Sequence, residues 1–178
     1  MDKREAAIKL AEKGFRVFPI PAGSRQAVLK DFPNKASSDP QIARDRWSAA
    51  ITGDPEHHNI AIATGHEIFV LDFDVKNGQC GKADLDHFEA IGLDVSAMAQ
   101  TATGGLHVYF RLPIGASVRN SVKKIRPGTD VRGHHGYVVA PGSETEQGAY
   151  KWLSEPFTID WIPLAPQWLI DLCGKPVE

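Results

Sequence analysis

Short apolar runs separated by polar turns fill this chain, and their spacing predicts both helices and strands. Helices are predicted over residues 6–13, 40–50, 82–91 and 166–172. Strands are predicted over residues 15–20, 59–65, 67–74, 99–102, 106–112, 130–132, 136–140 and 150–152. Gly14 is a helix stop, and Asp39-Pro40 has the form of an N-cap followed by a proline. Short strands with few helices indicate an α+β fold and not a doubly wound sheet.

The composition is that of a globular protein. With 178 residues, 42% of them hydrophobic and 24% charged, the chain can bury a core as one domain. Its two cysteines lack C-x-x-C spacing, which argues against a structural zinc site and a disulfide framework. No apolar run approaches the ~20 residues of a membrane span, and the charged N-terminus lacks a signal-peptide core. We therefore expect a cytoplasmic protein without membrane contact.

Charge is unevenly distributed, although the net charge is only −2. Residues 51–100 carry 2 Lys and Arg against 9 Asp and Glu. Residues 1–50 carry 10 against 6, and residues 101–150 carry 6 against 3. Basic segments thus flank an acidic block, an arrangement by which a nucleic-acid binder can hide a basic stripe behind a neutral total.

The apolar run from Ile68 ends in two carboxylates, Asp72 and Asp74. On a strand these two side chains share a face, while Leu71 and Phe73 point into a core. Two such close charges resist joint ionisation unless a cation lies between them, so the pair suggests a divalent metal site. A solvated strand end, or a carboxylate that caps the next turn, explains it equally well.

A second candidate combines Thr103-Gly104-Gly105 with the strand that contains His107. The glycines allow close backbone approach and leave N–H groups free for phosphate oxygens. On this strand His107, Tyr109 and Arg111 would form a polar stripe opposite a core-facing set. That combination suits a triphosphate, whereas a plain hairpin with a surface histidine is the alternative.

The third candidate is Asp130-Val131-Arg132, where the two charged side chains would share a face. By itself it could be a salt-bridged turn. Taken together, the three candidates supply three carboxylates, a histidine and an arginine on strand ends. Acids around one or two Mg²⁺ or Mn²⁺ ions are what phosphoryl and nucleotidyl transfer require, and an arginine fork can hold phosphate.

In this order and at this spacing, the motifs resemble those of the primase–polymerase (prim-pol) domain of the archaeo-eukaryotic primase superfamily, found in plasmid and phage replication proteins. The matching stretches are residues 71–78, 103–107, 128–133 and 136–143, with a similar N-terminal pattern over residues 14–19 and 59–65. The resemblance implies a single catalytic domain over residues 1–178. Within it, an RRM-like module of mixed or antiparallel strands over about 66–178 would pack with a smaller α/β part over about 1–65.

The resemblance also implies roles for individual residues. Asp72, Asp74 and Asp130 match acids that bind the catalytic Mg²⁺ or Mn²⁺, one or two ions, and His107 matches the histidine that contacts the nucleotide phosphates. Nucleotide-binding positions would be Thr103, Gly104, Gly105, His107 and Arg132. The implied reaction is template-directed addition of nucleotides by a DNA primase, a DNA polymerase or both, in the replication of a phage, plasmid or other mobile element. Implied partners are single-stranded DNA template and primer, NTP or dNTP, and a helicase domain or protein.

A basic cluster precedes Asp130. Arg119, Lys123, Lys124 and Arg126 are candidates for contact with a template or primer backbone, given the resemblance; a solvated loop is the other interpretation. His134 and His135 stand where relatives more often carry a small or acidic residue, and their role is open. The loop over residues 24–35 aligns loosely, so its Arg25 receives no role.

Other functions remain open at this point. A phosphatase of the haloacid dehalogenase type also places D-x-D after an apolar strand, as does a D-x-D glycosyltransferase. Neither explains the Gly104-Gly105-x-His107 sequence. A DNA- or nucleotide-binding module that keeps the fold and lacks turnover is the non-enzymatic alternative.

Overall fold

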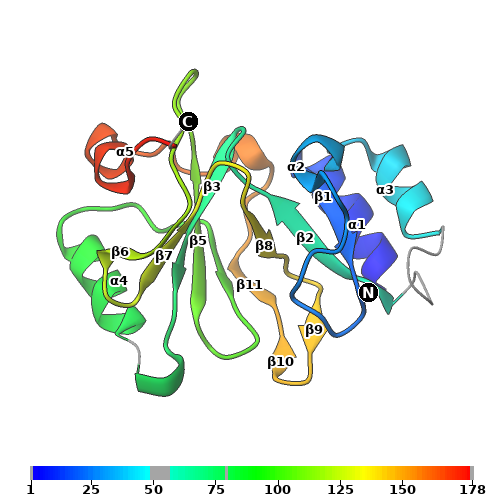
Figure 1. The fold of residues 1–178 in the computed structure, drawn as a ribbon, viewed down its shortest axis with the longest axis horizontal. Coiled ribbons are helices and arrows are strands. Elements are labelled where there is room, and N and C mark those ends of the chain that lie inside the picture. Colours follow the sequence, from blue (N-terminus) through cyan, green and yellow to red (C-terminus); the bar gives the residue numbers. More distant parts are fainter. Residues whose placement is uncertain (1, 49–56, 79, 177–178) are drawn as a thin grey trace.

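The computed structural model describes residues 2–48, 57–78 and 80–176, and it is an α+β fold, as predicted (Figure 1). The helices are α1 (Lys3–Glu12), α2 (Phe32–Lys35), α3 (Pro40–Arg46), α4 (Gly81–Ala90) and α5 (Gln167–Cys173), with 3-10 turns η2 (Lys76–Gly78) and η3 (Ile159–Trp161). The strands are β1 (Val17–Ile20), β2 (Asn59–Ala63), β3 (Ile68–Phe73), β4 (Met98–Gln100), β5 (Leu106–Arg111), β6 (Ser121–Arg126), β7 (Thr129–Arg132), β8 (Tyr137–Val139), β9 (Glu144–Thr145), β10 (Gly148–Ala149) and β11 (Lys151–Ser154). The helix predicted over residues 40–50 corresponds to α3, and its expected end near residue 50 lies outside the described residues.

A six-stranded antiparallel sheet carries the motifs. Its strand order is β11-β4-β5-β3-β7-β6, so β3 lies near the centre between β5 and β7. One face packs against α4 and α5, because the core-facing residues Leu71, Phe73 and Val131 meet apolar side chains of those helices. The alternation that predicted Leu71 and Phe73 in a core is therefore confirmed.

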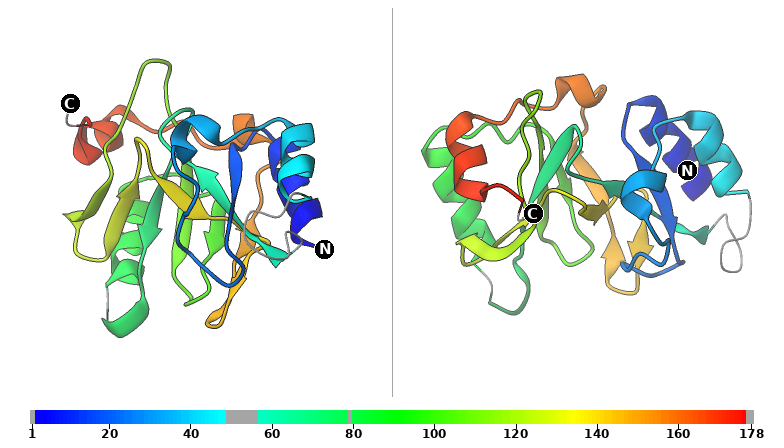
Figure 2. Two further views of the ribbon diagram at one scale, coloured as in Figure 1. Left: turned by 45° about the vertical axis from the view of Figure 1, so that its right-hand side comes forward. Right: turned by 45° about the horizontal axis from the view of Figure 1, so that its top comes forward.

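The second sheet is smaller and has the order β1-β2-β8. Helices α1 and α3 lie at its end of the molecule, and α4 and α5 lie at the opposite end (Figure 2). The N-cap predicted at Asp39 is present, since its carboxylate accepts hydrogen bonds from the N–H groups of Gln41 and Ile42. Strand β8 pairs with β2 although it comes late in the chain. The N-terminal part therefore completes its sheet with a strand from the second module.

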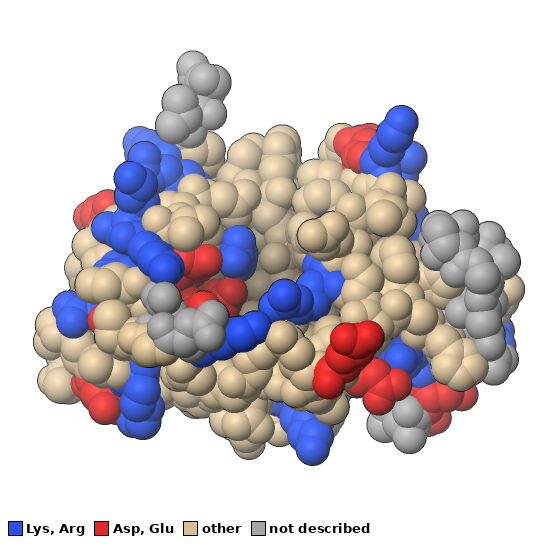
Figure 3. All heavy atoms as spheres, turned by 60° about the horizontal axis from the view of Figure 1, so that its bottom comes forward, with Lys and Arg blue, Asp and Glu red and all other residues tan. Residues whose placement is uncertain are grey.

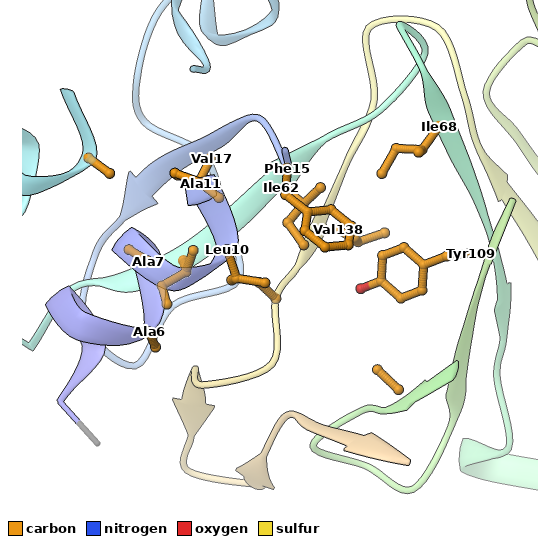
Figure 4. Close-up of a cluster of buried hydrophobic side chains, with 14 of the residues drawn as sticks. Ala6, Ala7, Leu10, Ala11, Phe15, Val17, Ile62, Ile68, Tyr109 and Val138 are labelled. Carbon is orange, nitrogen blue, oxygen red and sulfur yellow. The ribbon is translucent and has the colours of Figure 1, made fainter. Parts of the chain in front are cut away.

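A shared apolar core joins the two sheets. It combines α1 and the small sheet with β3 and β5, and the ring of Tyr109 points from β5 toward Val138 and Ile62 (Figure 4). Tyr109 is fully buried, so this member of the predicted polar stripe belongs to an apolar core. The small sheet covers this half of the large sheet, and strand alternation alone does not reveal such a cover.

Two further findings complete the fold. The stretch over residues 113–129, which lacks a clear pattern, contains the edge strand β6. Its Lys123 has a positive φ of 53° and its pairing with β7 shifts register, which explains why no alternation is visible. Among the described residues, no helix has the length and apolar character needed to cross a membrane.

Candidate active site

Three of the predicted site residues lie in one row across neighbouring strands. Asp72 on β3 is directly opposite His107 on β5 and directly opposite Asp130 on β7. Side chains of directly opposed residues point to the same face of a sheet at short separation. Sequence alternation predicted the strands, and the strand register brings their polar residues together.

Arg132 joins the two carboxylates of this row. Its Nη2 lies 2.9 Å from Asp130 Oδ2 and 3.4 Å from Asp72 Oδ2. Asp130 also accepts a hydrogen bond from the main-chain N–H of Lys123 at 3.0 Å. Burial raises the pKa of the Asp130 carboxyl, the Arg132 charge lowers it, and the Asp72 charge raises it further. The net direction of the pKa shift is upward, and burial is its largest cause.

His107 is buried at the end of the row. Only 5% of the residue is exposed, its Nε2 lies 3.6 Å from Asp72 Oδ1, and its Nδ1 has no hydrogen-bond partner among the described residues. Burial lowers the pKa of the imidazole, while the Asp72 charge opposes this and the Arg132 charge adds to it. A neutral imidazole with one unpartnered nitrogen thus lies beside the Asp72 carboxylate.

The depressed pKa of His107 makes stability depend on pH. In the unfolded chain the imidazole binds a proton near pH 6.5, whereas the folded protein binds it only at lower pH. Stability should therefore fall as the pH drops below about 6.5, because the unfolded state takes up more protons. We expect His107→Gln to remove this part of the decline. Urea unfolding at several pH values, in chelator, measures it; equal slopes for both proteins would contradict the assignment.

Asp74 lies apart from the row. It follows the last residue of β3, is exposed, and its carboxylate accepts a hydrogen bond from the N–H of Lys76 at 2.9 Å. The one hydrogen bond that its carboxylate forms in the described structure is therefore that of a cap on the next turn. In the described parts of the chain, no group of three or more His, Cys, Asp and Glu is arranged to hold a metal ion. The metal role of Asp74 accordingly stays a prediction.

The two glycines before β5 are required by the backbone conformation of the turn and by its close approach to β3. Gly104 has a φ of +85° in the turn, where L side chains are strained. A Cβ on Gly105 would lie 2.7 Å from the carbonyl oxygen of Phe73, so this position admits only glycine. Neither glycine nor Thr103 lines the cleft described below. Their predicted contact with a nucleotide stays untested.

A cleft of about 580 Å³ opens in front of the row. The space-filling view shows a hollow on this face, with acidic side chains beside it and Lys and Arg around them (Figure 3). Its lining residues are Arg25, Gln26, Phe32, Asp72, His107, Asn120, Arg132, His135, Gly136, Tyr137, Val138, Val139 and Tyr150. The cleft thus lies between the two sheets, with Asp72, His107 and Arg132 on one wall.

Several cleft residues were not found from the sequence. Arg25, which received no role, reaches the cleft from the loop after β1, and Tyr137 holds that loop. The Tyr137 hydroxyl accepts from the N–H of Ala27 and donates to the carbonyl of Arg25, both at 3.1 Å. Burial raises the pKa of the Tyr150 phenol while the Arg25 charge opposes it. No local sequence signal marks these residues, since tertiary packing brings them together.

The four predicted DNA-contact residues separate into different environments. Arg126 donates from Nε to the buried carboxylate of Asp84 at 2.8 Å. Asp84 Oδ2 also accepts from the N–H of Gly128 at 2.7 Å and from the Thr129 hydroxyl at 2.9 Å. Asp84 therefore fixes the turn that leads into β7 and Asp130. Lys123 is exposed, whereas Arg119 and Lys124 line a second groove.

The comparisons with known proteins identify a family for the chain. No curated protein matches the chain. The profile of the Prim-Pol family, described as bifunctional DNA primase/polymerase, N-terminal, matches residues 7–168. That match spans both sheets and every residue of the row. The chain therefore belongs to the Prim-Pol family of bifunctional DNA primase/polymerases.

Proposed function

We propose that this protein is a metal-dependent nucleotidyltransferase that extends or starts a DNA strand on a single-stranded template. Family membership implies primase or polymerase activity. The observation that supports the specific chemistry is the alignment of Asp72, His107 and Asp130 across three neighbouring strands, with Asp72 and His107 lining the cleft. Replication of a phage, plasmid or other mobile element is the context that we propose for it.

The donor set suits Mg²⁺ or Mn²⁺. Carboxylate oxygens are the ligands that these ions prefer, and Asp72 and Asp130 approach closely enough for one guanidinium to contact both. Burial raises the pKa of Asp130 and the nearby Asp72 charge adds to this, and a bound cation would relieve the repulsion between the two acids. In our proposal these two acids hold one or two ions, with Asp74 as a further ligand. When bound, the ions would activate the attacking hydroxyl and neutralise the leaving pyrophosphate.

The neighbouring residues would position the nucleoside triphosphate. Arg132 offers a planar fork of donors, which matches phosphate oxygens, and it already lies beside both carboxylates. Neutral His107 can donate a hydrogen bond to a phosphate oxygen without adding charge to the buried site. The cleft volume of about 580 Å³ falls within the usual range for small ligands. Phe32, Tyr137 and Tyr150 supply apolar surface for a base and sugar.

Primer extension by the unmodified protein tests the proposal. A labelled primer on a single-stranded template should lengthen when dNTPs and Mg²⁺ or Mn²⁺ are added, and chelator should abolish this. A parallel reaction without primer, using labelled nucleotides, tests initiation. Pyrophosphate is the expected product, since the bond broken lies between the α- and β-phosphates.

The alternatives predict different products. A phosphatase would release inorganic phosphate from a phosphomonoester and would not lengthen the primer. A binding module without turnover would bind DNA or nucleotide and give no incorporation in any metal. Absence of extension with both metals would refute the polymerase proposal.

A further inference from the structure

We infer that the groove lined by Arg119 and Lys124 binds the sugar–phosphate backbone of the single-stranded DNA whose end reacts in the cleft. This inference rests on the proposed function and adds a binding site to it. The groove, of about 430 Å³, is lined by Arg119, Asn120, Ser121, Val122, Lys124, His134 and Pro176. We call it the β6 groove.

Two unpaired cations of residues 101–150 line this groove. Residues 101–150 contain 6 Lys and Arg, and three of them are held in ion pairs: Arg111 with Asp160, Arg126 with Asp84, and Arg132 with Asp72 and Asp130. The other three are Arg119, Lys123 and Lys124, and within the described chain they form no ion pair. With a net charge of −2, affinity for DNA has to come from such a local cluster.

The surroundings of the three cations divide them between two sites. Lys123 lies beside the acids, since its main-chain N–H donates to Asp130 at 3.0 Å, and it does not line the β6 groove. Lys124 and the preceding Arg119 face the β6 groove, where both are exposed. The Ser121 hydroxyl, also on the groove, has no hydrogen-bond partner in the described structure and can donate to a phosphate oxygen.

The β6 groove continues into the cleft. Asn120 lines both, His134 lines the groove, and His135 lines the cleft. The two imidazole rings stack at a centroid separation of 3.8 Å. Asn120 fixes this turn by accepting from the N–H of Gly133 and donating to the carbonyl of His134, both at 2.7 Å. A polynucleotide is long enough to place phosphates in both spaces, whereas an isolated anion would occupy only one of them.

The test measures binding of DNA without catalysis. A fluorescein-labelled oligothymidylate is titrated in chelator between 50 and 200 mM salt, and anisotropy gives the dissociation constant. Each lost contact to a single strand should reduce the slope of log K against log salt by about 0.7. Arg119→Ala with Lys124→Ala should therefore reduce it by about 1.4 and weaken binding roughly 20-fold at 0.1 M salt. Lys124→Ala alone should give about half the change in slope.

A matched control removes the same charges elsewhere. Arg44 on α3 and Lys151 on β11 are exposed and form no ion pair with another described residue. Arg44→Ala with Lys151→Ala should leave both slope and affinity unchanged. Binding of a single dNTP, followed by calorimetry, should be unchanged in the groove variant because the cleft is intact.

The outcomes separate this inference from the proposed function. If the groove variant keeps the unmodified slope and affinity while the unmodified protein extends primers, the groove assignment is wrong and the polymerase proposal stands. If the groove variant shows the reduced slope of log K against log salt but the unmodified protein extends no primer, the groove assignment is supported and the polymerase proposal fails. If the control variant loses as much slope and affinity as the groove variant, DNA binds by non-specific attraction and the groove assignment is wrong.

Discussion

Replacing Asp72 by asparagine should lower the rate of nucleotide incorporation roughly a thousandfold. A divalent ion contributes several kcal/mol to stabilising the transition state of phosphoryl transfer, and each 1.36 kcal/mol is a factor of about ten in rate. The amide keeps the shape of the side chain but removes the charge that holds the ion. Asp130→Asn should cause a similar loss, since the two carboxylates contact the same arginine.

The measurement is single-turnover extension of a labelled primer at saturating DNA and dNTP. Glu67→Gln provides the control, because it removes one exposed carboxylate that does not line the cleft. Thermal unfolding should show little net change for Asp72→Asn, since the variant loses the ion pair with Arg132 but also the repulsion from Asp130. Activity within a few-fold of the unmodified protein would exclude Asp72 as a metal ligand. The same replacement at Asp74 tests the third proposed ligand separately.

The second large effect concerns stability. Asp84→Ala should lower the free energy of unfolding by about 3 kcal/mol, the lower end of the range for breaking a buried ion pair. The Asp84 side chain is only 2% exposed, and its loss would leave Arg126 and two buried donors, the Gly128 N–H and the Thr129 hydroxyl, without their acceptor. Urea unfolding followed by circular dichroism gives the value.

Asp86, two residues further along α4, provides a control. Asp86 forms an exposed i,i+4 pair with Lys82 on the same helix, and Asp86→Ala should cost about 0.5 kcal/mol or less. Asp84→Asn should lie between the two, because it can still accept hydrogen bonds but carries no charge. Equal stability of Asp84→Ala and Asp86→Ala would show that the buried network contributes nothing measurable.

Asp84 should also add to acid sensitivity. Burial raises the pKa of its carboxyl, but the hydrogen bonds from Arg126, Gly128 and Thr129 outweigh burial and hold the pKa below its usual value. A carboxyl with a depressed folded-state pKa stabilises the protein above its unfolded pKa of about 3.9. This contribution is lost as the pH falls through the folded value. The Asp84→Ala variant should therefore show a weaker dependence of stability on pH in that acid range.

The sequence predicted the elements of the site better than its environment. The strands with Asp72, His107 and Asp130 follow from apolar alternation, and they form the predicted kind of sheet. Tyr109 was assigned to a polar stripe because alternation reports two faces but not whether another sheet covers one of them. Asp84 resembles any surface acid of a helix in the sequence, since its three donors come from residues more than forty positions away.

Arg25 and Tyr137 show a related limit. They lie 112 positions apart and meet only because the loop after β1 folds over β8. No period or motif links such positions in a single sequence. The family resemblance supplied the acids and the histidine, whose motifs are short and local, while the residues that line the opposite wall of the cleft came from the fold alone.

The crossings between the two sheets bear on how the protein unfolds. The chain passes from β2 to β3 beside its later passage from β7 to β8, and Thr64 bonds to the carbonyls of Gly136 and Gly133 at 2.9 and 2.8 Å. A Cβ on Gly65 would lie 2.4 Å from His134 Cα, so the passages touch. The walls of the cleft therefore cannot melt one after the other as independent units. Chemical denaturation should unfold both sheets in one cooperative transition.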